Sequence, residues 1–225
     1  MKFYFDTEFT GLKKNTTLIS IGVISESGHT FYAESTEYEE KDPSVKEDRW
    51  IQKNVIDNLY ITENDENMDN YRFSGKEKEI GERLNRWVVR EMCTQESENS
   101  NIALFISDCA AYDTVLLFDL LTGGKTALQL DEYIVPVVYD IIEDIQNYPL
   151  IIGDSMEDDY QNAFNYNREE FMENIFQDYI EQYCSVFDID NKMKEFFPKG
   201  DAKKHNALWD AMVIKSISDL LNILA

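Results

Sequence analysis

The chain has 225 residues and a formal net charge of −23, and 43% of its residues are hydrophobic. This composition excludes a disordered chain, and the length suits one sizeable domain with room for an insertion. No apolar run reaches the ~18 residues of a membrane helix and no leader pattern is present, so we expect neither a membrane segment nor a signal peptide. The three cysteines match no ligand spacing and favour reduced thiols in the cytoplasm: Cys93, Cys109 and Cys184.

The net charge by itself favours an acidic interaction protein, because a strongly negative surface repels nucleic acid at long range. The lysines, however, are not spread evenly along the chain. Lys13 and Lys14 follow the first expected strand, and Lys199, Lys203 and Lys204 precede the last expected helix. Both groups lie beside the acidic motifs described below.

Three strands are expected at the start of the chain, over residues 2–8, 18–25 and 30–36. Turn-forming residues separate them, among them Gly28. Because the connections are short, we expect the three strands to form an antiparallel meander.

The rest of the chain predicts helices with two further strands among them. In chain order, the expected elements are a helix at about 46–58, a loop at 62–75, a helix at 76–93, a strand at 102–107, a helix at 110–121, a strand at 134–140 and a helix from about 207. Residues 141–198 are acidic and aromatic, with a mainly helical pattern. We therefore expect a single α/β domain over residues 1–225, with a five-stranded mixed sheet flanked by helices and an acidic helical insertion at about 141–198.

Four acidic residues and a histidine stand at the ends of these elements. Asp6 and Glu8 end the first strand, and their spacing places both carboxylates on one side of it. Such a pair loses hydration and is self-repelling, a cost that a bound cation removes. Asp113 lies in the first turn of the helix after the fourth strand; Asp210 lies early in the last helix, with His205 just before it. Taken singly, each has an ordinary explanation such as helix capping.

Together, the strings D-x-E-x-T-G-L, A-A-Y-D and H-x-A-x-x-D resemble the three motifs of the DEDDh 3′→5′ exonucleases, the superfamily of RNase T and the proofreading exonucleases, which has an RNase H-like fold. The matching residues are Asp6, Glu8, Thr10, Gly11 and Leu12; Ala110, Ala111, Tyr112 and Asp113; and His205, Ala207 and Asp210. Residues 1–60 also resemble a bacterial exoribonuclease subfamily that trims adenylate-rich RNA 3′ ends, through "TLISIGVISESGHTFYAESTEY" and "RWIQKNVI". Residues 62–75 and 140–200 show no such likeness.

The resemblance implies two divalent cations, Mg²⁺ or Mn²⁺, held by carboxylate oxygens and roughly 3.5–4 Å apart. Asp6 would contact both ions. Glu8 and Asp210 would bind the ion that activates water, and Asp113 would bind the second ion.

By the same resemblance, His205 would be the general base, and an unperturbed pKa near ~6.5 suits this role. An offset of five residues within one helix would separate the side chains of His205 and Asp210 by about 140°. We therefore expect His205 in the preceding loop, with the helix beginning at Asn206 or Ala207.

The resemblance also implies contacts to the terminal nucleotide from the segment that follows Glu8. These residues are Phe9, Thr10, Gly11, Leu12 and Lys13. Leu12 would either wedge between bases or pack in the core, and Phe9 would either stack on a base or fill the core. Trp50 is a further stacking candidate, although a buried helix anchor is the favoured interpretation.

The expected function is that of a two-metal-dependent 3′-5′ exoribonuclease for RNA degradation, releasing nucleoside monophosphates from single-stranded RNA 3′ ends. Its expected partner is a single-stranded nucleic acid 3′ end, with RNA favoured over DNA and no membrane, and a homodimer is plausible by resemblance. Two alternatives remain open. One is a single-stranded DNA 3′-5′ exonuclease, and the other is a non-catalytic acidic interaction protein on the same fold that binds its partner through residues 140–200.

Overall fold

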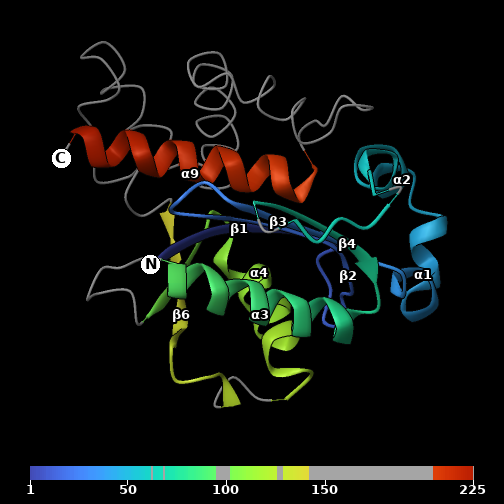
Figure 1. The fold of residues 1–225 in the computed structure, drawn as a ribbon. Coiled ribbons are helices and arrows are strands. Elements are labelled where there is room, and N and C mark those ends of the chain that lie inside the picture. The colour runs from blue at the N-terminus through green and yellow to red at the C-terminus, as the bar shows by residue number, and fades with distance from the viewer. Residues whose placement is uncertain (62, 68, 95–101, 126–128, 142–204, 225) are drawn as a thin grey trace, which may run out of the picture.

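A computed structural model describes the chain apart from residues 62, 68, 95–101, 126–128, 142–204 and 225 (Figure 1). Its elements are β1 (Lys2–Phe9), β2 (Leu18–Ser25), β3 (Thr30–Ser35), α1 (Tyr38–Lys41), η1 (Pro43–Lys46), α2 (Arg49–Asn54), η2 (Ile56–Asn58), β4 (Asn70–Gly75), α3 (Glu77–Thr94), β5 (Ala103–Ser107), α4 (Ala110–Thr122), β6 (Ile134–Asp140) and α9 (Ala207–Leu224). Within these residues, no helix is long and apolar enough to cross a membrane.

One mixed sheet organises the described part of the chain, with the strand order β4-β3-β2-β1-β5-β6. The pairs β1–β2 and β2–β3 are antiparallel, which confirms the predicted meander. The pairs β3–β4, β1–β5 and β5–β6 are parallel, so β2 alone runs against the other strands. This mixed α/β arrangement is compatible with the RNase H-like fold that the resemblance implies.

The prediction of a five-stranded sheet is wrong, because the sheet of the described residues has six strands. The additional strand, β4, falls within the segment 62–75 that was predicted to be a loop. Tyr71 and Phe73 are buried while the residues between and around them are partly exposed, an alternation typical of a strand with one face on the core. The polar residues that precede Tyr71 concealed this short alternating pattern.

The single helix predicted at about 46–58 is also wrong. The chain instead forms three short helices, η1, α2 and η2. Asp48 has an extended conformation and separates the first two of them. Its carboxylate accepts hydrogen bonds from the backbone N–H groups of Trp50, at 3.0 Å, and Ile51, at 3.1 Å, and so caps α2.

Helices cover both faces of the sheet (Figure 1). On one face, α3 and α4 enclose an apolar core that includes Phe3, Phe5 and Trp87. On the other, α9 packs over a second core that includes Tyr4 and Tyr32. Neighbouring residues of β1 therefore point into different cores, which fixes the side on which every residue of this strand lies.

Close contact between α9 and the sheet depends on Gly22 in the middle of β2. A Cβ atom built at this position would lie 2.4 Å from the backbone oxygen of Ala207 and 2.3 Å from the backbone nitrogen of Leu208. These distances are too short for any side chain. The absence of a side chain at Gly22 therefore lets the first turn of α9 rest directly on β2.

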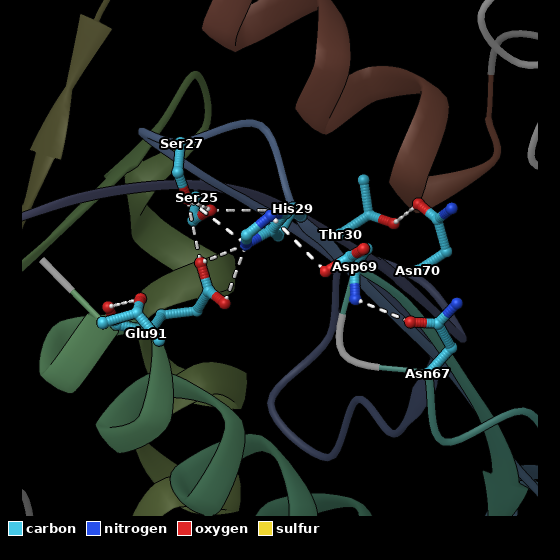
Figure 2. A network of polar contacts seen from close by, with 9 residues as sticks. Ser25, Ser27, His29, Thr30, Asn67, Asp69, Asn70 and Glu91 are labelled. Atoms are coloured by element: carbon cyan, nitrogen blue, oxygen red, sulfur yellow. Dashed lines mark hydrogen bonds and ion pairs between the residues drawn. The ribbon is translucent and has the colours of Figure 1, made fainter.

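A polar network ties the β2–β3 turn to α3 (Figure 2). Buried Glu91 accepts a hydrogen bond from Ser27 Oγ at 2.9 Å, and both of its carboxylate oxygens lie 3.0 Å from His29 Nδ1. The other ring nitrogen of His29 lies 3.5 Å from Asp69, just before β4. The pairing of Phe3 with Ser25 places this turn at the start of β1, so His29 lies at the opposite end of the sheet from Glu8.

Two further predictions concern the thiols and the insertion. Cys93 and Cys109 are free and exposed. Cys184 and all but the first residue of the acidic insertion predicted at about 141–198 lie outside the described residues.

Candidate functional site

The last residues of β1 place two carboxylates under the first turn of α9. Tyr4 points into the α9 core, and Asp6 and Glu8 follow it at intervals of two along the same strand. Asp210 projects from the first turn of α9. Carboxylate oxygens of Asp6, Glu8 and Asp210 lie within 4.8 Å of one another, so these three residues can share one cation.

Asp113 is held rigidly on the first turn of α4, where it is only 1% exposed. Its Oδ1 accepts a hydrogen bond from Thr7 Oγ1 at 2.5 Å, and its Oδ2 accepts one from Ser107 Oγ at 2.7 Å. Both donors are neutral hydroxyl groups, so the carboxylate is oriented without a paired positive charge. The carboxyl ends of β1 and β5, which are parallel neighbours, supply these hydroxyl groups.

A fifth carboxylate, Asp108, was missed in the sequence. It follows the last residue of β5, and its oxygen lies within 4.8 Å of oxygens from both Asp6 and Asp113. The sequence shows only that an acidic residue directly follows a buried strand; the parallel pairing of β5 with β1 in the structure places it at the same edge of the sheet as Asp6. Asp6 therefore belongs to two groups of carboxylates, one shared with Glu8 and Asp210 and the other with Asp108 and Asp113.

The carboxyl groups raise one another's pKa values. Burial has the largest effect on Asp6, followed by the charges of four neighbouring acids, and these raise its pKa well above the usual range. Glu8 is affected in the same way, first by burial and then by Asp210. Burial also raises the pKa of Asp108 to about 7, with Asp113 as its strongest charged neighbour, and the pKa of Asp113 to about 6.

This donor set fits a hard divalent cation. Every candidate ligand atom is a carboxylate oxygen, and oxygen donors are those that Mg²⁺ and Mn²⁺ prefer. A cation between these groups would replace mutual repulsion by attraction and lower their pKa values.

His205 lies beside this cluster, in the turn that precedes α9 as predicted. Its backbone N–H donates a hydrogen bond to Asp210 Oδ2 at 3.0 Å. Its ring meets the ring of Trp50 edge-to-face, with centroids 4.9 Å apart. The φ angle of His205 is +68°, an uncommon conformation for a residue with a side chain.

The segment that follows Glu8 leaves the sheet in a tight turn. Thr10 is buried, and its backbone and side chain both pair with Thr17. Gly11 has a φ angle of +122°, which favours glycine. Leu12 is 75% exposed, so of its two open interpretations packing in the core is wrong.

Phe9 and Trp50, the two aromatic residues considered for base stacking, have different surroundings in the structure. The Phe9 ring stacks on the ring of Tyr112 in α4, with centroids 5.4 Å apart and an interplanar angle of 19°. Trp50 is 55% exposed, so the prediction of a buried helix anchor is wrong; Ile51 is the buried residue of α2. A ring exposed to solvent beside His205 remains available for stacking.

Lys13 is already engaged by the protein. It forms an ion pair with Asp42 and donates a hydrogen bond to Ser44 Oγ at 3.2 Å. The hydrogen bond from Lys13 holds the pKa of Asp42 well below its usual range. Any phosphate contact from Lys13 must compete with this acid.

Comparison with known proteins gives a partial match. Over 59 residues the chain is 39% identical to proteins named 3′-5′ exoribonuclease from two strains of Mycobacterium tuberculosis, CDC 1551 and H37Rv. The match covers 26% of this chain and 33% of each of those proteins. No family model matches the chain.

Proposed function

We propose that this protein is a two-metal-dependent 3′-5′ exoribonuclease of the DEDDh type, which shortens single-stranded RNA and releases nucleoside monophosphates. One observation carries the proposal: the carboxylates of Asp6, Glu8 and Asp210 converge with His205 next to them. The partial match to proteins named 3′-5′ exoribonuclease supports a nucleic acid substrate, and we take RNA as that substrate from their name. The closer preference for adenylate-rich 3′ ends rests on the resemblance of residues 1–60.

In this proposal, Asp6, Glu8 and Asp210 would hold one divalent cation, and Asp6, Asp113 and Asp108 would hold the other. When bound, two such cations supply an activated water and stabilise the charge that develops on the phosphoryl and leaving oxygens. The carboxylates fix the positions of these charges, and the hydroxyl groups bonded to Asp113 keep its orientation constant.

The remaining residues handle the proton and the terminal nucleotide. His205 accepts a proton from the attacking water, because imidazole is the side chain best suited to general-base chemistry near neutral pH. Exposed Leu12 and Trp50 provide apolar surface against which unstacked bases pack. By the resemblance, Phe9 and Thr10 would contact the terminal sugar.

The test uses 5′-labelled single-stranded RNA and DNA of the same sequence, each with and without an adenylate tail, incubated with Mg²⁺, Mn²⁺ or EDTA. We expect a ladder that shortens from the 3′ end of RNA only when metal is present. Asp210→Asn removes a metal ligand without changing side-chain size, and the rate should fall at least ~100-fold.

The matched control is Asp219→Asn on the same helix, where the carboxylate pairs with Lys215 at 2.6 Å. This variant should retain the wild-type rate. Faster shortening of DNA than of RNA would instead assign a single-stranded DNA exonuclease. No shortening of any substrate by folded protein would favour the acidic interaction protein.

A further inference from the structure

A hydrogen-bonded chain of buried polar side chains runs from β3 to Asn206, the residue that precedes α9. Asn206 Nδ2 donates a hydrogen bond to Tyr32 Oη at 3.1 Å, and Tyr32 Oη donates one to Glu34 Oε1 at 3.1 Å. Tyr32 is 0% exposed, Asn206 is 1% exposed and Glu34 is also buried. Burying three polar side chains is costly unless their hydrogen bonds are satisfied, so their arrangement is closely specified.

At one end of this chain, Asn206 uses both halves of its amide group. Its Oδ1 accepts hydrogen bonds from the backbone N–H groups of Leu208, at 3.1 Å, and Trp209, at 3.3 Å, which caps α9. Its Nδ2 donates to Tyr32 and also to the backbone oxygen of Asn58, at 3.1 Å. Capping requires only the acceptor, so the donor half has a separate role: it fixes the start of α9 relative to β3 and η2.

At the other end of the network, Glu34 binds the backbone of the segment that follows η2. Its Oε1 accepts hydrogen bonds from the backbone N–H groups of Tyr60, at 2.5 Å, and Ile61, at 3.0 Å. Trp50, whose ring meets that of His205, lies in α2, ten residues before Tyr60. Figure 1 shows α2 beside the first turn of α9.

The direction of the hydrogen bonds is fixed by the Tyr32 hydroxyl group. Burial, together with the nearby charge of Glu34, raises the pKa of Tyr32 well above its usual range. The hydroxyl group therefore stays protonated, donates to Glu34 and accepts from Asn206.

His205, next to Asn206, has the left-handed backbone conformation noted above. For a residue with a side chain this conformation is strained, and it persists only where surrounding contacts require it. Those contacts are the hydrogen bond to Asp210 and the fixed position of Asn206.

We propose that Tyr32 and Asn206, supported by Glu34, are positioning residues that hold His205 in place for its role as general base. They act through the backbone at the start of α9, where the backbone oxygen of Asn206 accepts a hydrogen bond from the backbone N–H of Asp210 at 3.0 Å. This inference rests on the proposed exonuclease function.

The test compares Tyr32→Phe, which removes only the hydroxyl group, with Asn206→Ser, which keeps a capping oxygen but is too short to reach Tyr32. The matched control is Tyr4→Phe. Tyr4 is buried under the same helix, but its hydroxyl group accepts a hydrogen bond from Ser218 near the other end of α9.

The first readout is independent of activity. The chain has two histidines, His29 and His205, so the ring signals in NMR spectra are assigned with one His29→Asn variant. We expect the ring signals of His205 to shift in Tyr32→Phe and in Asn206→Ser as the contact with Trp50 changes. The His29 signals should stay constant, and Tyr4→Phe should move neither set.

The second readout is single-stranded RNA hydrolysis. We expect kcat to fall about 10-fold in Tyr32→Phe and in Asn206→Ser, with KM and Mn²⁺ affinity within about twofold of wild type. The double variant should lose no more activity than either single variant, because both substitutions break the same series of hydrogen bonds.

The inference is overturned if Tyr32→Phe and Tyr4→Phe give the same NMR spectra and the same kcat, even if both unfold at a lower temperature. That result would leave the exonuclease proposal intact provided that wild type degrades RNA. Inactive wild-type protein would overturn the exonuclease proposal, and the inference with it.

Discussion

Asp108 completes the second group of carboxylates, which it forms with Asp6 and Asp113. Without it, Asp6 and Asp113 alone would bind a second cation, and both oxygens of Asp113 already accept hydrogen bonds from hydroxyl groups. Asp108 supplies a further oxygen within 4.8 Å of both, at a position where burial has raised its pKa to about 7. This carboxylate therefore gains more from a nearby cation than a solvated one would.

We expect Asp108→Asn to weaken the lower-affinity of two Mn²⁺ sites about 10-fold while the higher-affinity site changes less than twofold. Isothermal titration calorimetry with Mn²⁺ measures both sites. The control is Asp140→Asn, because Asp140 also raises the pKa of Asp108 and Asp113 through its charge but does not belong to either group of carboxylates. Equal weakening by both variants would mean that Asp108 contributes only charge and is not a ligand.

The position of α9 depends on the close packing of its first turn against Gly22 in β2. The same first turn of this helix supplies Asp210 and follows His205, so any displacement of the helix moves both. An alanine at Gly22 would place its Cβ 2.4 Å from the Ala207 backbone oxygen, and backbone cannot move aside as a flexible side chain can.

We expect Gly22→Ala to lower the free energy of unfolding by about 1–3 kcal/mol. We also expect a loss of RNA hydrolysis that is larger than this destabilisation explains. Urea unfolding and hydrolysis rates measure the two effects. The control is Ile80→Val, which lowers stability by about 1 kcal/mol in the core on the opposite face and should leave hydrolysis unchanged. Equal rates in the two variants at matched stability would show that Gly22 affects folding alone.

The elements that sequence predicted well have strong apolar patterns or clear ends. β2 is buried along its whole length, and α4 ends at Thr122, one residue beyond the predicted end, where Gly123 has the left-handed conformation. β4 was missed because its apolar pattern rests on Tyr71 and Phe73 alone, and its pairing with β3 is a tertiary effect that local sequence does not encode. The prediction of one helix at 46–58 was wrong because the helical pattern continues through Asp48, whereas in the structure Asp48 caps a separate helix, α2.

The candidate site was predictable where the spacing of residues along an element determines the direction of their side chains. Asp6 and Glu8 share a face because strands alternate, and His205 was placed outside the helix by an angle argument that the structure bears out. Asp108 and the contacts of Asn206 were not predicted. They depend on which strands are neighbours and on which side chains meet across the sheet, and both are properties of the folded chain rather than of any segment.

Both the net charge of −23 and the buried acids of the site make the stability of the folded molecule depend on pH. Asp108 and Asp113 have pKa values of about 7 and about 6 in the folded protein, above the ~3.9 of an unfolded aspartate. The folded state thus binds more protons than the unfolded state between about pH 4 and pH 7. Stability from these groups is present at low pH and is lost as the pH rises through their folded pKa values.

We therefore expect the Tm in EDTA to fall as the pH rises from about 5 to 8, and Mn²⁺ to restore it at pH 8, because a cation bound only by the folded state stabilises it. Differential scanning calorimetry measures both effects. Surface repulsion from the excess of acids gives the same trend, but ~0.5 M NaCl screens exposed charges far more than buried ones. A slope that persists in salt and flattens in Asp108→Asn belongs to the carboxylate cluster. A slope that salt abolishes belongs to the surface, and would mean that the acids of the site are not held at raised pKa values.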